Sequence, residues 1–221
     1  MIEIKGLTKN YSIDGQIFKA VDNVSLSVKK GDMVSIIGHS GSGKTTLLSL
    51  IGGLTKPDAG EVLIDNINIW SMSDSALSMF RNKKISFIYQ FASLIPTLSA
   101  LDNIMLPTAF GEETGDIRKR AEELLSLVGL REKSGAYPAH LSGGQQRRIA
   151  IARAFINSPE IILADEPTGD LDEETEDEII RLFQNMSEKK ETTFLIVTHN
   201  KEIAARARRQ LSMSNGVLSE K

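Results

Sequence analysis

Cysteine is absent from this sequence of 221 residues, and histidine occurs only three times. The lack of cysteine excludes disulfides, thiolate metal sites and cysteine nucleophiles. A zinc site would have to be built mostly from carboxylates, because the three histidines are widely scattered. Basic residues are not in excess either, since 26 Lys and Arg stand against 29 Asp and Glu, for a net charge of −3. Proteins that coat nucleic acid normally carry a basic excess, so we expect no nucleic-acid partner.

Long apolar stretches are missing as well. No run approaches the roughly 18 residues that a membrane-spanning helix needs, and the N-terminus lacks the apolar stretch of a signal peptide. We therefore expect a soluble, cytoplasmic chain that meets a membrane only through a partner. Hydrophobic residues still make up 41% of the sequence, and a chain of this length favours one compact domain with a subdomain.

Strand-like apolar runs alternate with helical stripes along the chain, which predicts an α/β fold around a parallel sheet. Amphipathic helices are expected over residues 117–128 and 173–190, and the second begins after Asp172 with acidic residues that suit the helix dipole. Four runs are short, apolar and largely β-branched, as parallel strands buried on both faces should be. These runs are residues 34–37, 85–88, 161–164 and 194–197.

The first 35 residues have a different pattern, in which apolar and polar residues alternate. This alternation predicts an N-terminal antiparallel β subdomain made of short strands. Residues 91–150 carry helical patterns and no comparable strand, so we interpret them as a helical insertion. The single domain of residues 1–221 would then consist of a core, residues 1–90 and 151–221, and this helical subdomain.

A phosphate-binding loop is the clearest motif. Residues 38–45 read GHSGSGKT, which fits G-x-x-x-x-G-K-[ST], between the predicted strand 34–37 and a helix-competent run. Glycines let successive N–H groups turn toward one centre, and a helix N-terminus adds positive potential. Lys44 would reach the β- and γ-phosphates, and the Thr45 hydroxyl would be a ligand of Mg²⁺. The residues expected to bind the nucleotide here are Gly38, His39 (through its backbone), Ser40, Gly41, Ser42, Gly43, Lys44, Thr45 and Thr46.

Two carboxylates, Asp165 and Glu166, end the apolar run 161–164. Side chains alternate across a strand, so neighbouring acids at its end can serve different tasks. We expect Asp165 to hold the metal ion, directly or through water, and Glu166 to take a proton from the attacking water. An acidic strand end alone is more often a solvated turn, and the phosphate loop is what favours the catalytic interpretation.

A second glycine motif, LSGGQ, occupies residues 141–145. Ser142 is a good N-cap, yet two glycines directly after a cap cost about 1 kcal/mol each relative to alanine in a helix. The pair makes sense if exposed N–H groups must approach an anion closely. The chain therefore has two anion-binding helix starts, of which one carries a lysine.

These motifs together resemble those of ABC-type ATPase cassettes, whose signature is LSGGQ, and the resemblance covers essentially the whole chain. It implies a P-loop NTPase parallel sheet with an N-terminal antiparallel β subdomain and a helical insertion carrying the signature. It also implies ATP hydrolysis with Mg²⁺ and a head-to-tail homodimer on ATP binding. In that dimer the signature of one chain serves the ATP held by the other, through Ser142, Gly143, Gly144 and Gln145.

The resemblance assigns roles to four further residues. Tyr11 matches the aromatic residue that stacks on adenine, and Gln90 matches the glutamine that contacts Mg²⁺ and the attacking water. His199 matches the switch histidine, which would contact the γ-phosphate and steady Glu166. Asp172 matches the aspartate at the end of the segment that lies between the two cassettes of the dimer.

Two segments indicate a subgroup. Residues 40–62 and 87–107 resemble those of lipoprotein-releasing ATPases, macrolide-type exporters, antimicrobial-peptide or haem exporters and a cell-division ATPase. The resemblance implies integral-membrane permease partners, a peripheral position on the cytoplasmic face of the cell membrane, and export, extraction or mechanical transmission. The alternatives are a soluble ABC ATPase of the iron–sulfur-assembly type and the cell-division type. Asp170 departs from the Asn or Ala often found at its position, and an added carboxylate could weaken dimer closure.

The loop after Gln90 is more apolar than a free surface loop requires. Contiguous apolar patches often mark partner sites, so we expect the permease to dock in a groove around Gln90 and residues 91–106. The side chains expected to be exposed there are Leu94, Ile95, Leu98 and Leu101.

Overall fold

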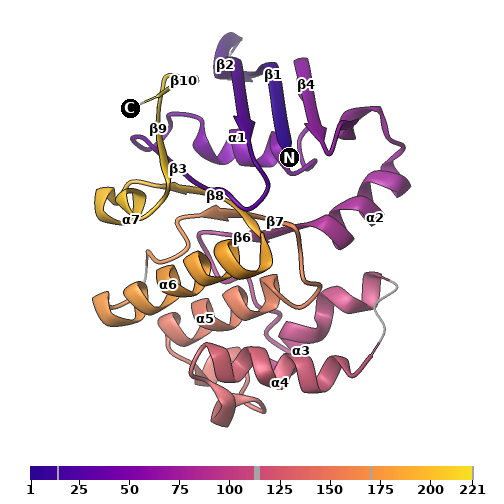
Figure 1. The fold of residues 1–221 in the computed structure, drawn as a ribbon, viewed down its shortest axis with the longest axis vertical. Coiled ribbons are helices and arrows are strands. Elements are labelled where there is room, and N and C mark those ends of the chain that lie inside the picture. The colour runs from indigo at the N-terminus through magenta and orange to yellow at the C-terminus, as the bar shows by residue number, and fades with distance from the viewer. Residues whose placement is uncertain (14, 112–114, 170, 221) are drawn as a thin grey trace.

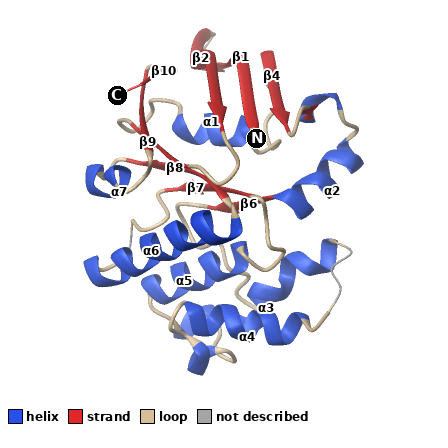
Figure 2. Cartoon of the chain, viewed as in Figure 1, coloured by secondary structure: helices blue, strands red, loops and turns tan. Residues whose placement is uncertain are grey.

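The computed structural model describes residues 1–13, 15–111, 115–169 and 171–220 (Figures 1 and 2). The strands are β1 (Ile2–Ile13), β2 (Gln16–Val28), β3 (Met33–Ile37), β4 (Ala59–Ile64), β5 (Ile67–Asn68), β6 (Ile85–Ile88), β7 (Ile161–Asp165), β8 (Thr193–Thr198), β9 (Arg209–Ser214) and β10 (Val217–Glu220). The α-helices are α1 (Lys44–Ile51), α2 (Asp74–Lys84), α3 (Ala100–Met105), α4 (Ile117–Leu127), α5 (Gly143–Ala154), α6 (Glu173–Lys190) and α7 (Lys201–Ala205). The 3₁₀ turns are η1 (Ile69–Ser71), η2 (Leu106–Phe110), η3 (Arg131–Lys133) and η4 (Pro138–His140).

One sheet has the order β10-β9-β3-β8-β7-β6, in which every pair from β9 to β6 is parallel and β10 is antiparallel. The predicted buried strands are its β3, β6, β7 and β8. Strand β8 shows why the sequences of these buried strands are continuously apolar: successive residues are buried on opposite faces of the sheet. Leu195 and Val197 join the hydrophobic cluster on one face, and Phe194 and Ile196 join the cluster on the other. The expected α/β class with a parallel sheet is confirmed.

The second sheet, in the order β2-β1-β4-β5, is antiparallel, as predicted for the N-terminal region. Its strands are longer than expected, since β1 has 12 residues and β2 has 13. The outer end of β2 forms through pairing with β1, and its exposed residues hide the alternation that marks a strand. Helix α1 lies between the two sheets (Figure 1), where Leu47 and Leu50 are fully buried.

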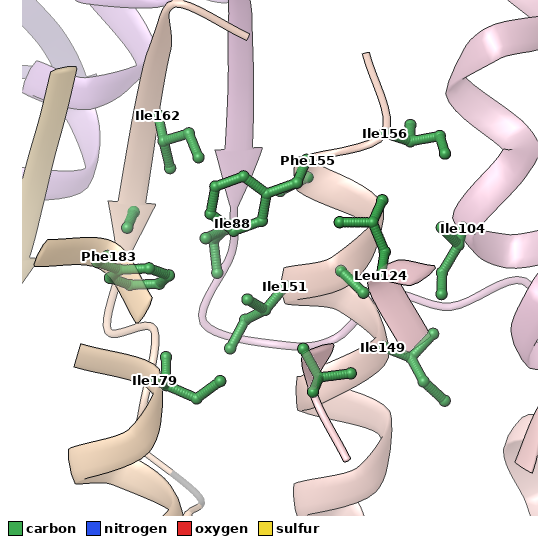
Figure 3. Close-up of a cluster of buried hydrophobic side chains, with 14 of the residues drawn as sticks. Ile88, Ile104, Leu124, Ile149, Ile151, Phe155, Ile156, Ile162, Ile179 and Phe183 are labelled. Atoms are coloured by element: carbon green, nitrogen blue, oxygen red, sulfur yellow. The ribbon is translucent and has the colours of Figure 1, made fainter. Parts of the chain in front are cut away.

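Helices cover the other face of the parallel sheet. Figures 1 and 2 show α5 and α6 against that face, with α3 and α4 farther out. One hydrophobic cluster runs through all of them, from Ile162 of β7 through Phe155 to Leu124 and Ile104 (Figure 3). The predicted helical insertion is therefore packed onto the sheet through α5. The predicted subdomain limit at residue 150 falls within α5, and the division of the chain stays a prediction.

Candidate active site

The phosphate loop leaves β3 and enters α1 in close contact with neighbouring backbone. A Cβ atom at Gly38 would clash with the carbonyl oxygen of Met213, and one at Gly43 would clash with that of Ala20. Gly43 also has a φ of 104°, which favours glycine. Since Gly43 offers α1 no side-chain cap, the first N–H groups of the helix are free to bind an anion.

Lys44 stands at the start of α1 with its side chain folded back over the loop. Its Nζ donates hydrogen bonds to the carbonyl oxygens of Gly38 and His39, at 2.7 and 3.0 Å, and the residue is 8% exposed. The ammonium therefore lies inside the curve of the loop, where a phosphate group cradled by the N–H donors would meet it.

Thr45 and Asp165 meet at the carboxyl end of the sheet. The Thr45 hydroxyl donates to Asp165 Oδ2 at 2.7 Å, although the two residues are 120 positions apart. Burial raises the pKa of the Asp165 carboxyl above its usual value, the Thr45 hydrogen bond and the Lys44 charge oppose this shift, and the Glu166 charge adds to it. The pair thus places two oxygen atoms of the kind that hard cations prefer side by side, and a cation would stabilise the partly buried carboxylate.

Glu166 adopts the left-handed backbone conformation, with a φ of 46°, and its side chain bonds other partners than that of Asp165. Its carboxylate accepts hydrogen bonds from Thr198 Oγ1 and from the backbone N–H of His199, each at 2.8 Å. His199 Nδ1 also lies 2.8 Å from Glu166 Oε1. The Glu166 side chain is 14% exposed and that of His199 is 75% exposed, so the histidine ring is the outermost member of the group.

Most of the predicted site residues surround one cavity of about 660 Å³. Gly38 does not line this cavity and lies against the backbone of Met213, whereas Phe18 and Ala20 line the cavity although no motif pointed to them. The predicted residues that line it are Tyr11, His39, Ser40, Gly41, Ser42, Gly43, Lys44, Thr45, Thr46, Gln90, Asp165, Glu166 and His199. A cavity of about 730 Å³ between α4 and the ends of α5 and α6 is lined by none of the predicted residues among those described.

The LSGGQ residues lie at a different place, the N-terminus of α5. Ser142 caps the helix by accepting from the backbone N–H of Gln145 at 3.2 Å, and the Gln145 side chain accepts from the N–H of Ser142 at 3.0 Å. Among the described residues, none of Ser142, Gly143, Gly144 and Gln145 lines the cavity of the phosphate loop. Within the described part of the chain, the two helix starts predicted to bind anions therefore do not line one cavity.

Asp172 likewise acts as a helix cap. Its carboxylate accepts from the backbone N–H of Thr175 at 3.0 Å and from the Thr175 hydroxyl at 2.9 Å, at the start of α6. These hydrogen bonds hold the pKa of Asp172 below its usual value. Asp170, whose carboxylate was expected to affect the dimer seam, lies outside the described residues.

Two arginines of α5 hold the backbone around Gln90, and sequence reasoning missed both. Arg147 is 1% exposed, and its guanidinium donates to the carbonyl oxygens of Tyr89 and Gln90. Arg153 donates to the carbonyl oxygens of Ala92 and Ser93, each at 2.9 Å, and burial lowers its pKa. The only signal in the sequence is that Arg147 stands just before, and Arg153 within, the run of Ile and Ala residues at 149–154 of α5.

The loop after Gln90 differs from its predicted exposure. Leu101 is 4% exposed because it lies in the first turn of α3, which packs on α5, so the prediction of an exposed Leu101 is wrong. Leu94 is partly buried against the same cluster. Ile95 is 41% exposed as expected, and Phe91, which was not singled out, is 74% exposed.

Comparisons with known proteins identify the family of the chain. Residues 21–169 match the family described as ABC transporter. MJ0796 of Methanocaldococcus jannaschii, described as an uncharacterized ABC transporter ATP-binding protein, is 45% identical over 98% of this chain and 94% of its own length. The lipoprotein-releasing system ATP-binding protein LolD of Bacteroides thetaiotaomicron is 41% identical over all of both chains.

Solved structures of ATP-binding cassettes also match this chain. The dimeric structure of a post-hydrolysis state of the MJ0796 cassette, bound to ADP and Pi, matches with a TM-score of 0.93 at 42% identity, covering 100% of this chain and 98% of that one. A second dimeric structure of that cassette matches with a TM-score of 0.94. The family model spans more than half of the sequence, and relatives above 40% identity align over nearly its full length. The chain therefore belongs to the ABC transporter family and is an ATP-hydrolysing cassette with the P-loop fold.

Proposed function

We propose that this ATPase works as a head-to-tail homodimer that powers export, extraction or mechanical transmission through integral-membrane permease subunits. One observation is the main support for the dimer: within one chain, the residues of the LSGGQ helix start do not line the cavity of the phosphate loop. The dimeric structures of a relative support a dimer for this chain as well. The name of the LolD relatives, which belong to a lipoprotein-releasing system, supports the membrane partner.

In this proposal the chain is peripheral on the cytoplasmic face of the membrane. Over the described ranges, no helix is both long and apolar enough to cross a bilayer, so anchoring would come from the permease. Residues 1–90 and 151–221 would act as the ATP-binding core, and residues 91–150 as the helical subdomain that presents the signature to the partner chain. A soluble assembly ATPase and a cell-division ATPase are the competing functions, and no described feature favours either.

ATP would be bound by groups that the phosphate loop holds ready. The N–H donors of residues 39–46 and the Lys44 ammonium would surround the β- and γ-phosphates, and the Tyr11 ring would stack on the adenine. From the partner chain, Ser142 and the two following glycines would approach the γ-phosphate. Asp172 would lie at the seam that closes when both chains hold ATP.

The donor set at the loop fits magnesium. Thr45 Oγ1, Asp165 Oδ2 and the Gln90 amide oxygen are hard ligands, and Mg²⁺ typically takes one or two carboxylates with the remaining positions filled by substrate phosphates and water. Among the described residues, no group of three His, Asp or Glu side chains could hold a metal ion alone. When bound, Mg²⁺ would neutralise charge on the phosphates. Its proposed protein ligands are Thr45, Gln90 and Asp165.

Hydrolysis itself would depend on Glu166. A carboxylate oxygen of Glu166 would take a proton from water as the water attacks the γ-phosphorus, while the Thr198 hydroxyl and the His199 N–H hold the carboxylate in place. The His199 ring, which is largely exposed, is free to contact the γ-phosphate of bound ATP. Gln90 would complete the site by orienting the same water.

Mixing two inactive variants tests the composite site. Lys44→Ala removes the phosphate-loop charge, and Gly143→Asp adds a carboxylate at a position where an added Cβ atom meets nothing within 4 Å in its own chain. Each variant alone should be inactive. An equal mixture should recover about a quarter of wild-type turnover, because half of the dimers are mixed and each has one intact site. A mixture as inactive as its components would contradict the head-to-tail arrangement.

A further inference from the structure

The β1–β2 hairpin brings two aromatic side chains to the mouth of the nucleotide cavity. Tyr11 of β1 and Phe18 of β2 are direct cross-strand partners, so their side chains lie on the same face of the sheet. Both line the cavity, and both are half-exposed, at 41% and 44%. Ile17, the neighbour of Phe18, is 77% exposed and is not among the described residues that line the cavity.

The position of Phe18 is fixed relative to the phosphate loop. The carbonyl oxygen of Ala20, which lies two residues farther along β2 and also lines the cavity, is so close to Gly43 that a Cβ there would clash with it. The turn at Gly216 adds two hydrogen bonds, from Asp22 N to Gly216 O at 2.9 Å and from Gly216 N to Ser42 O at 3.0 Å. Phe18 comes two residues before Ala20 on β2 and pairs with Tyr11, so these contacts hold the hairpin and its two rings beside the phosphate loop.

The Tyr11 ring already has one face covered. Lys9 Nζ lies over it, 5.7 Å from the ring centroid. Lys9 is held in this position by Asp58 Oδ1 and the carbonyl oxygen of Lys56, each at 2.9 Å. A planar ligand would therefore stack on the opposite face of Tyr11, and Phe18 is the adjoining aromatic side chain in the cavity wall.

We propose that Phe18 extends the aromatic surface of Tyr11, contacts the base of bound ATP, and makes the site favour purine over pyrimidine nucleotides. A purine has the larger planar area, so it gains more than a pyrimidine from a second ring. The inference rests on the proposed function only in that ATP occupies this cavity. Alanine substitution of an aromatic residue that stacks on a base costs roughly five- to a hundredfold in affinity. Because Phe18 shares the base with Tyr11, we expect roughly five- to tenfold, the low end of that range.

Equilibrium binding to the full chain tests this, with ATP, CTP and inorganic tripolyphosphate as the probes. Tripolyphosphate reports on the phosphate loop alone because it has no base. Phe18→Ala should weaken ATP binding by roughly five- to tenfold, leave tripolyphosphate affinity unchanged and narrow the preference for ATP over CTP. Phe18→Trp should retain ATP affinity. The matched control, Ile17→Ala, removes a neighbouring exposed side chain and should change none of the three affinities.

Three outcomes would overturn the inference. Unchanged ATP affinity in Phe18→Ala would mean that the ring does not touch the base. An equal loss for ATP and tripolyphosphate would mean that the substitution disturbs the phosphate loop. An unchanged ratio of ATP to CTP affinity would remove the role in base selection. Tyr11→Ala separates this failure from that of the proposed site: if it weakens ATP binding while Phe18→Ala does not, only the Phe18 inference fails.

Discussion

The guanidinium of Arg147 donates to the backbone carbonyl oxygen of Gln90 from a position that is 1% exposed. Arg147 belongs to α5, whose N-terminus is the LSGGQ motif, and Gln90 lines the cavity of the phosphate loop. Arg153, on the same helix, fixes the next part of the loop through Ala92 and Ser93. The helix that we propose reaches the partner's ATP is therefore tied to the residue that we propose contacts Mg²⁺ on its own chain.

Arg153→Met should slow hydrolysis more than it weakens ATP binding. The substitution keeps most of the side-chain volume but removes both hydrogen bonds to the loop after Gln90, each worth about 1 kcal/mol. We expect a several-fold lower kcat with nearly unchanged ATP affinity, measured by steady-state turnover and by equilibrium binding. Arg209→Met is the control, because Arg209 also bonds a carbonyl oxygen, that of Ser27 at 2.7 Å, from β9, which three strands of the sheet separate from β6. Equal effects of the two variants would argue against a specific role of Arg153.

Glu166→Gln should stop steady hydrolysis while leaving ATP binding intact. Loss of a general base typically costs about 10²–10⁴ in rate. The amide can keep a hydrogen bond to Thr198, and it removes a negative charge beside the phosphates. ATP should then hold two chains together, which size measurement in the presence of ATP would detect. A variant that binds ATP yet stays monomeric would contradict the composite site, and full-rate turnover would assign the base elsewhere.

Lys44→Ala should weaken ATP binding and abolish activity. The ammonium is nearly buried, so its attraction to phosphate is screened less than that of a surface lysine. Titration of the variant with ATP gives the affinity, and thermal unfolding checks that the chain still folds. An ATP affinity equal to that of the wild type in a folded variant would refute the assignment of Lys44.

The strands and motifs could be predicted because their signals are local. The buried runs 85–88 and 161–164 are continuous and apolar, and they are the strands β6 and β7 to within one residue. The phosphate loop carries its own chemistry in consecutive residues, so its position beside β3 followed directly.

The residues that were missed act through contacts between distant parts of the chain. Arg147 meets Tyr89 across 58 positions, and nothing near Arg147 in the sequence indicates where its guanidinium goes. Thr198 precedes the predicted switch histidine, but only the fold brings its hydroxyl to Glu166, 32 positions away. Leu101 was expected to be exposed because the residues around it in the sequence suggest a loop. They form the six-residue helix α3 instead, and this helix buries Leu101 in the core.

Thr45→Val should raise the Mg²⁺ concentration needed for activity. Valine has nearly the shape of threonine but lacks the hydroxyl that bonds Asp165, so one proposed oxygen ligand is lost and the Asp165 carboxylate loses a partner. We expect a Mg²⁺ titration of ATPase activity to shift by about tenfold or more, while ATP binding measured in EDTA changes little. Thr45→Ser keeps the hydroxyl and should behave like the wild type. A Mg²⁺ dependence equal in Thr45→Val and Thr45→Ser would exclude Thr45 as a ligand.

Phe91→Glu should abolish binding to the permease that we propose as the partner, while leaving the isolated ATPase intact. The side chains of Tyr89, Phe91 and Ile95 are 44%, 74% and 41% exposed, and they flank Gln90 on the loop that α5 holds. An apolar cytoplasmic segment of the permease would cover them, and a new carboxylate in such an interface costs several kcal/mol when it is desolvated without a partner. Leu94 is unsuitable for this test because it packs against the core.

Co-purification with the permease and basal ATP turnover are the two measurements. Val217→Glu is the matched control, because Val217 is an exposed apolar residue, 53% exposed, on β10 at the opposite edge of the parallel sheet from β6. Phe91→Glu should keep basal turnover and lose the permease, whereas Val217→Glu should keep both. If Phe91→Glu still bound the permease normally, the loop after Gln90 would not be the docking surface. The conformational change would then have to reach the permease through another face of the helical region.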